Sequence, residues 1–154
     1  MTLVIVSPVA GRVVPLSEVP DPVFAQAIVG PGVAVEPDDD ATDAVAPISG
    51  TIAKLHPHAS VIGSSDDRGV LAHLGIDTVQ LEGQGFTLHA GDGDTVTAGQ
   101  LLTTWSPADV RAGGRSAIVP VIAMQAEPDQ VTILAQPGTH VAAGDPLMQW
   151  TDPQ

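Results

Sequence analysis

His73 is the residue whose sequence surroundings best suit chemistry. It stands in the apolar run 70–74 and is followed by Gly75 and Asp77. Histidine is costly in such a strand, because both ring nitrogens need hydrogen-bond partners. On an ideal strand Asp77 would lie on the same side as His73, and Gly75 would leave room for a bulky group. The alternative is a histidine with a purely structural role, satisfied by the backbone.

A second histidine, His58, lies upstream in His56-Pro57-His58. A neutral imidazole has one free lone pair and can attack phosphorus near neutral pH. The proton on its other nitrogen must then be held by an acceptor. A second imidazole could donate a hydrogen bond to the phosphoryl oxygens and lower the barrier. The pair therefore suits phosphoryl transfer, with His73 as nucleophile and His58 as its helper.

The same side chains could instead bind zinc. His58 and His73 would supply two ligands, and Asp77 or His56 a third. Both His-x-His and His-x-x-x-Asp resemble ligand spacings. Residue types alone leave the phosphoryl and zinc interpretations open.

Composition and charge exclude several classes of function. The 154 residues are 44% hydrophobic, which predicts a single domain over 1–154 with its own core. The absence of cysteine excludes disulfides, thiolate metal sites and a cysteine nucleophile. The net charge of −13 disfavours nucleic acids and anionic membranes and favours basic partners. No signal peptide or membrane-spanning run is recognisable, so a cytoplasmic location without membrane insertion is expected.

Glycine and proline punctuate the chain. The 16 Gly and 14 Pro predict many short strands and turns rather than long helices. Strands are expected over 70–74 and 116–124, and two short strands over 28–35. Residues 18–27 are expected to form a turn followed by at most one helical turn. Ser106 as N-cap and Pro107 at the first position predict one short helix.

Two pairs of segments repeat. Residues 7–16 resemble 46–55, and 93–105 recur as 138–150, with Val-x-Ala-Gly and a tryptophan at the same offsets. Such self-similarity implies that one structural unit is used twice. Each Val-x-Ala-Gly suits a short, half-buried strand, and each tryptophan can close one end of a core. The expected fold is an all-β sandwich with internal duplication and only short helical turns.

The segment 71–86 resembles the active-site segment of the glucose-type EIIA proteins, phosphocarriers of the bacterial phosphoenolpyruvate:sugar phosphotransferase system. The resemblance covers essentially the whole chain, because 7–11, 19–25, 28–32 and 45–52 match further blocks in order. The stretch 55–59 is similar to actinobacterial members in particular. The family fold is a β-sandwich with internal duplication, related to the barrel-sandwich of biotinyl and lipoyl domains.

The resemblance implies a role for each matching residue. His73 matches the histidine phosphorylated on Nε2, and His58 the accessory histidine that contacts the phosphoryl group. Asp77 matches a supporting aspartate expected to influence partner electrostatics. Many members have an aromatic residue in place of Ser60, so a thinner docking patch is expected here. The apolar positions that match partner-docking residues are Val23, Phe24, Leu71 and Val79.

The function implied by the resemblance is phosphoryl transfer from phospho-HPr to His73 and on to a cysteine of a sugar-specific EIIB domain. The acceptor would be EIIB or EIIBC of a glucose or N-acetylglucosamine permease, and regulatory proteins are further partners to expect. No cofactor or catalytic metal is implied, although His58 and His73 could take up zinc adventitiously.

Two other functions are alternatives to this one. A zinc-dependent, peptidase-like or metal-binding domain of related fold would use His58, His73 and Asp77. In such peptidases the His-x-x-x-Asp precedes the His-x-His, whereas here the order is reversed. A swinging-arm carrier is disfavoured, because Lys54 lies in a strand-like run with no methionine beside it.

Overall fold

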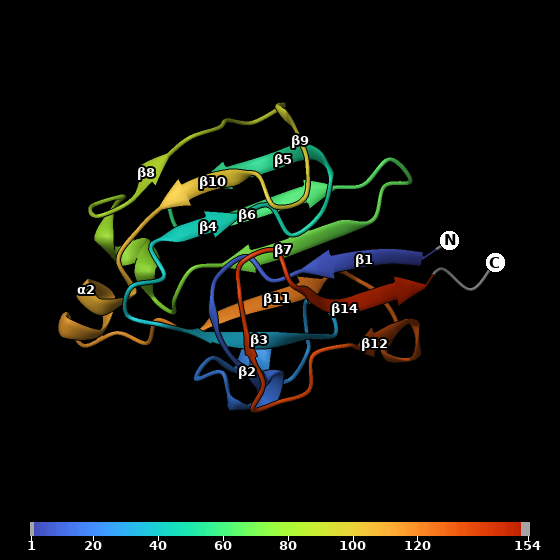
Figure 1. Ribbon diagram of the computed structural model, residues 1–154, viewed down its shortest axis with the longest axis horizontal. Helices are drawn as coiled ribbons and strands as arrows, with labels where there is room; N and C mark the ends of the chain where they lie inside the picture. Colours follow the sequence, from blue (N-terminus) through green and yellow to red (C-terminus); the bar gives the residue numbers. More distant parts are fainter. Residues whose placement is uncertain (1, 152–154) are drawn as a thin grey trace.

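Antiparallel strands make up most of the regular secondary structure, as the computed structural model of residues 2–151 shows (Figure 1). The strands are β1 (Thr2–Val6), β2 (Gly11–Pro15), β3 (Gly32–Pro37), β4 (Asp43–Val45), β5 (Gly50–His56), β6 (Ala59–Gly63), β7 (Gly69–His73), β8 (Thr87–Leu88), β9 (Thr95–Val96), β10 (Leu101–Thr104), β11 (Val119–Ala123), β12 (Val131–Ile133), β13 (His140–Val141) and β14 (Pro146–Thr151). The helices are α1 (Pro22–Ala25), α2 (Pro107–Ala112) and the 3-10 turns η1 (Leu16–Glu18), η2 (Thr78–Leu81) and η3 (Pro128–Gln130).

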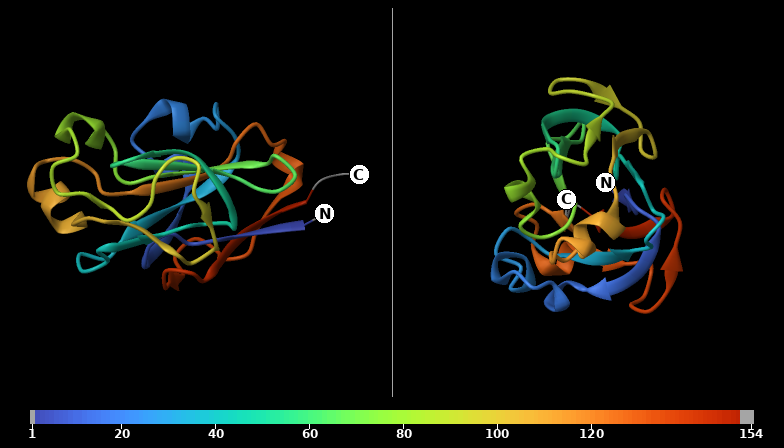
Figure 2. Two further views of the ribbon diagram at one scale, coloured as in Figure 1. Left: turned by 90° about the horizontal axis from the view of Figure 1, so that it is seen from above. Right: turned by 90° about the vertical axis from the view of Figure 1, so that its left-hand side faces the viewer.

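One large sheet has the strand order β13-β2-β3-β11-β7-β6-β5-β9. Two three-stranded sheets, β1-β14-β12 and β4-β10-β8, complete the described part of the chain. Seen along the long axis, the strands curve around a common interior (Figure 2, right). The all-β sandwich with only short helices, expected from the sequence, is confirmed.

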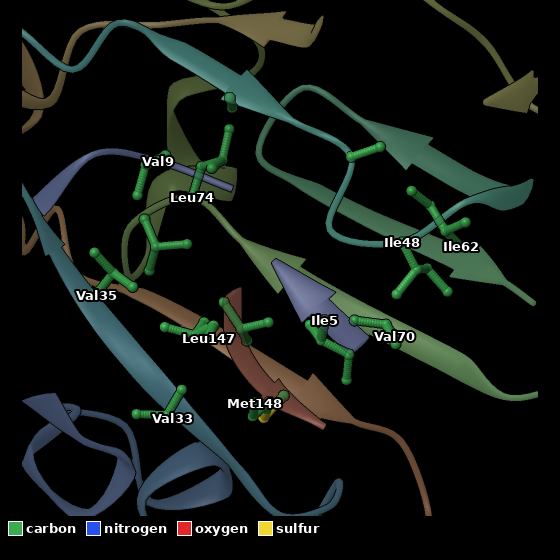
Figure 3. Close-up of a cluster of buried hydrophobic side chains, with 14 of the residues drawn as sticks. Ile5, Val9, Val33, Val35, Ile48, Ile62, Val70, Leu74, Leu147 and Met148 are labelled. Carbon is green, nitrogen blue, oxygen red and sulfur yellow. The ribbon is translucent and has the colours of Figure 1, made fainter. Parts of the chain in front are cut away.

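The interior is aliphatic, in keeping with the scarcity of aromatic residues. Side chains from different strands converge there (Figure 3), among them Ile5, Ile62, Val70, Leu147 and Met148, all fully buried. Trp105 and Trp150 are also buried in this cluster.

The alternation along β7 decides the position of the candidate nucleophile. Val70 and Ala72 point into the core, whereas Leu71 and His73 are partly exposed. β7 thus places His73 on the outer face of the large sheet, while the buried side chains of Val70 and Ala72 hold the strand against the core.

The two sequence repeats occupy equivalent places. β2 pairs with β13, with Gly11 opposite Val141, and β5 pairs with β9, with Gly50 opposite Val96. Equivalent hydrogen bonds fix both units: Gly138 N to Val13 O at 2.7 Å and Gly93 N to Ile52 O at 2.8 Å, then Gly144 N to Ser7 O at 2.8 Å and Gly99 N to Ala46 O at 2.9 Å. The repeated sequence therefore encodes a repeated backbone, and the internal duplication is confirmed.

α2 begins where the sequence predicts, and α1 is the single helical turn expected within 18–27. Asp21 accepts a hydrogen bond from the Val23 amide at the start of α1, and Ser106 accepts one from the Asp109 amide at the start of α2. The prediction of two strands over 28–35 is wrong in its first half. Residues 28 and 29 form a bend and residues 30 and 31 belong to no regular element. β3 starts only at Gly32, because Pro31 has no N–H to donate to a ladder.

Candidate active site

Adjacent strands bring His58 and His73 together. Pro57 and His58 form the turn between β5 and β6, and β6 pairs with β7 so that Ala59 lies opposite His73. The carbonyl of His58 accepts a hydrogen bond from the Leu74 amide at 2.7 Å. The two imidazoles meet edge to face, with ring centroids 5.2 Å apart and planes at 64°. The sequence prediction that these histidines act together is therefore sterically sound.

The ring of His73 is held in one tautomer. Its Nδ1 lies 2.5 Å from the carbonyl oxygen of Gly75. A carbonyl can only accept, so Nδ1 carries the proton and donates it. In the neutral ring the lone pair is then on Nε2, for which the residues in 2–151 provide no hydrogen-bond partner. This is the state that a nucleophilic imidazole requires.

His73 contacts a second ring besides that of His58 and has carboxylates nearby. The ring of Phe24, in α1, lies 5.4 Å from that of His73 and is tilted by 57°. Burial lowers the pKa of His73, and this outweighs the Gly75 carbonyl, Asp21 and Asp77, each of which raises it. The neutral form is therefore favoured in the free protein, while any positive charge that develops on the ring finds negative groups nearby.

Acidification is expected to charge His73 only below pH 6.5, its ordinary pKa. Because the folded pKa is the lower one, the unfolded chain binds more protons in this window. The contribution of His73 to the free energy of unfolding is thus complete above 6.5 and lost as the pH falls through the folded pKa. An NMR titration of the His73 ring would test this; a midpoint at or above 6.5 would contradict the predicted burial effect. Urea unfolding of wild type and His73→Gln at neutral and acidic pH would isolate the stability part.

His58 has a lowered pKa as well. Burial is the largest cause, followed by repulsion from His73 and from His56. His56, the last residue of β5, stacks on His58 with ring centroids 5.5 Å apart and planes at 19°. The site therefore contains three imidazoles in a row, and the position of the third, His56, could not be predicted from the sequence.

Gly75 shapes the turn that holds the His73 proton. Its φ is +81°, in the left-handed region that glycine adopts without strain. A Cβ at this position would come within 2.6 Å of Thr78 Cγ2 and 3.0 Å of the Ser116 carbonyl. Thr78 is itself buried, and its hydroxyl donates to the Leu74 carbonyl at 2.7 Å. The turn is thus closed from both sides, which fixes the direction of the Gly75 carbonyl.

Replacing Gly75 by alanine is expected to cost about 1–2 kcal/mol for the left-handed backbone. Overpacking against Thr78 should add a further ~1–3 kcal/mol. Gly114→Ala is the matched control, because Gly114 also has a left-handed φ (+87°) but no atom within 4 Å of its missing Cβ. Urea unfolding of both variants measures the difference. Equal losses would show that the turn around Gly75 is not tightly packed.

Asp77 does not lie where an ideal strand would put it. β7 ends at His73, and Asp77 has a left-handed φ of 62° at the start of η2. The expectation that Asp77 continues the strand face of His73 is therefore wrong, although its charge still acts on His73. Asp21, which precedes α1, acts on the ring more strongly and was not anticipated. Its only sequence signal was the Asp-Pro pair that marks a helix start.

The four apolar positions expected at the rim differ in exposure. Val23 is 44% exposed and Val79 58%, while Leu71 is half-buried. Phe24 is buried, with 8% of its surface exposed, and belongs to a small cluster that packs under the rim with Leu71 at its edge. Phe24 therefore supports the His73 ring from below, whereas Val23 and Val79 reach solvent.

Residues 3–129 match the family model described as phosphoenolpyruvate-dependent sugar phosphotransferase system, EIIA 1. The chain belongs to this EIIA family. It is 39% identical over 122 residues to the glucose-specific EIIA component of Oceanobacillus iheyensis, covering 78% of this chain and 73% of that protein. It also superposes on glucose permease IIA from Mycoplasma capricolum with a TM-score of 0.86 and 30% identity, covering 97% of this chain and 96% of the other.

EIIA proteins are phosphotransferase components. They accept phosphate from HPr and pass it to EIIB, so this chain is a phosphoryl carrier in sugar transport. In residues 2–151 no helix is long and apolar enough to cross a bilayer.

The zinc interpretation of this EIIA is not favoured. It required His58, His73 and Asp77, or His56, to converge on one ion. Across the described residues 2–151, no three histidine, aspartate or glutamate side chains are arranged to hold a metal. The three imidazoles form a row, and Asp77 lies beyond the end of β7, at the start of η2.

Ser60 does not thin the docking patch of this EIIA. It pairs with Ala72 on the inward face of β6 and β7 and is 7% exposed. With Leu74 and Leu102 it lines a small internal hollow. The exchange of an aromatic residue for serine thus changes interior packing, and the expectation of a weaker outer surface is wrong.

Proposed function

We propose that His73 is the phosphoryl acceptor of this EIIA and that His58 stabilises the phosphoryl group. The observation that carries the proposal is the hydrogen bond from Nδ1 of His73 to the Gly75 carbonyl. It leaves the Nε2 lone pair for attack and sets the ring beside His58. Asp21 and Asp77 are supporting residues, and residues 1–154 act as one domain.

The phosphoryl transfer from HPr to His73 needs no general base. Nε2 of His73 attacks phosphorus as the P–N bond to the histidine of HPr breaks, and the electron pair of that bond returns to the HPr ring. Nδ1 keeps its proton, so the phosphorylated ring carries a positive charge. The groups that raise the pKa of His73, namely the Gly75 carbonyl, Asp21 and Asp77, favour this same charge. In the second step a cysteine thiolate of EIIB takes the phosphoryl group, and Nε2 regains its lone pair.

Partner docking uses the rim of the site. Val23, Leu71 and Val79 form an apolar edge that excludes water from the labile P–N bond, with Phe24 packed beneath. Asp21, beside the rim, adds negative charge to a chain of net charge −13. A partner with a basic rim around an apolar centre fits this surface, and electrostatic attraction would speed its association.

The acceptor is proposed to be EIIB of a glucose permease. Support comes from the two similar proteins named above, both described as glucose-specific or glucose permease components. EIIB of an N-acetylglucosamine permease is the second candidate. A cytoplasmic location belongs to the proposal, because phosphoenolpyruvate is a cytoplasmic metabolite.

Intact-mass measurement tests the proposal. The protein is incubated with phosphoenolpyruvate, enzyme I and HPr, and then with each EIIB in turn. One phosphoryl group per chain is expected, with phosphorus bonded to Nε2 of His73 in the NMR spectrum, and loss of that group on addition of the glucose EIIB. Phosphate on another residue would refute the site. Discharge by the N-acetylglucosamine EIIB alone would refute the choice of permease.

A further inference from the structure

A third histidine extends the pair that the proposed function uses. His56 is the last residue of β5, and its ring stacks on that of His58 at 5.5 Å and 19°. On its other side His58 meets the edge of His73 at 5.2 Å. The imidazole of His58 therefore lies between two other imidazoles.

His58 has little else to hold its ring. It belongs to the two-residue turn between β5 and β6, and no strand pairing fixes its side chain. Within residues 2–151 neither of its ring nitrogens makes a hydrogen bond. Its orientation in the unphosphorylated protein thus depends on ring contacts with His56 and His73.

His56, in contrast, sits on a fixed backbone. It pairs with Ala59 across the β5–β6 hairpin. The preceding amide, that of Leu55, donates to the Asp92 carboxylate at 2.7 Å, and Lys54 reaches the same carboxylate at 3.5 Å. The end of β5 is therefore anchored to the loop that carries Asp92, and His56 is a firm surface for a stacked ring.

We propose that His56 is a positioning residue, whose stacked ring holds the imidazole of His58 where it donates a hydrogen bond to the phosphoryl group on His73. This inference rests on the proposed function of His58 and His73. Stacked rings stabilise each other by more than the burial of their surface alone. A hydrogen-bond donor that is held in place before the reaction avoids the entropic cost of being oriented during it.

Charge on His56 has a separate effect, because it disfavours protonation of His58 in the free protein. His56 repels a proton from His58, after burial and His73 the third cause of the lowered pKa of His58. The charged groups that face this end of β5 are Asp92 and Lys54, while Asp21 and Asp77 act on His73. When a dianionic phosphoryl group arrives, its negative charge reverses the local field and favours proton-donating imidazoles.

Two substitutions separate the stacked ring from a general structural role. His56→Ala removes the ring and His56→Phe keeps an aromatic face without a titratable group. His89→Ala is the control. His89 is an exposed histidine that is hydrogen-bonded to Thr104, and it follows β8, which belongs to a different sheet from β5, β6 and β7. All variants are charged by HPr, and the rate of transfer to EIIB is followed.

His56→Ala is expected to accept a full phosphoryl group but to pass it on about three- to tenfold more slowly. His56→Phe should restore most of that rate, and the KM for EIIB should stay unchanged because the rim residues are intact. In both variants the His58 NMR titration should move to higher pH, since the repulsion from His56 is gone.

Three outcomes would overturn the inference. A wild-type rate in His56→Ala would show that the ring is not needed. Equal losses in the alanine and phenylalanine variants would show that the loss does not follow the stacked ring. Failure of the wild-type protein to take up phosphate on His73 would refute the proposed function and this inference with it. That outcome is distinguishable from failure of the inference alone, because it is seen in the wild-type protein and involves no His56 variant.

Discussion

The His73→Gln protein is expected to take up no phosphate from HPr. Glutamine is close to histidine in size, and its amide N–H can still donate to the Gly75 carbonyl, so the turn after β7 should persist. Its nitrogen lone pair is delocalised into the amide and cannot attack phosphorus. Removing the nucleophile should lower the rate of charging by at least about 10³-fold.

Reconstitution with phosphoenolpyruvate, enzyme I and HPr, followed by intact-mass measurement, checks this result. His89→Gln serves as the control, because it changes a histidine outside the cluster to the same residue. Urea unfolding of both variants verifies that each is folded. Phosphate on His73→Gln would move the acceptor to another residue, with His58 the first to be examined.

Much of the framework could be predicted from the sequence because it depends on local rules. Glycine and proline density predicted short strands, and Ser106 and Asp21 behave as helix caps. The repeats predicted a duplicated unit because backbone hydrogen bonds depend on residue spacing, and Gly138 and Gly93 make equivalent bonds.

Tertiary geometry at the site was harder to predict. Placing Asp77 on the face of His73 assumed that the strand continues, whereas the left-handed residues Gly75 and Asp77 end it. The expected effect of Ser60 on the docking patch was wrong because Ser60 faces inward on β6, which its residue type does not indicate. Errors like that over Asp77 arise wherever the regular alternation of side chains along a strand is extended past the residue at which the strand ends.

The sequence indicates that the Nδ1 proton of His73 needs an acceptor, but it does not identify that acceptor. A backbone carbonyl supplies it, and no residue type signals that a carbonyl will point at a ring. The row of imidazoles depends likewise on the pairing of three strands, because β5, β6 and β7 set His56 and His58 beside His73. The sequence could name these histidines but could not say which of them touch.

His58→Gln is expected to separate the two steps of phosphoryl transfer. In the first step the attacking group, His73, is neutral, and the labile P–N bond of the donor supplies the driving force. In the second step the attacking group is a thiolate, which carries negative charge toward a phosphoryl group that is also negative. Stabilisation of the phosphoryl oxygens by the His58 imidazole, 5.2 Å from His73 between ring centroids, is therefore worth more in the second step.

The variant should be charged by HPr to the full extent and should then discharge to EIIB about 10²-fold more slowly. Rapid-quench measurement of both steps on one preparation provides the comparison, with His140→Gln as control. His140 is exposed and engaged with Asp38, far from His58 in the strand order of the sheet. Normal discharge by His58→Gln would remove His58 from the mechanism, whereas loss of charging would mean that His58 is needed before phosphate reaches His73. The ratio of the two rates thus reports directly where along the transfer the second imidazole acts.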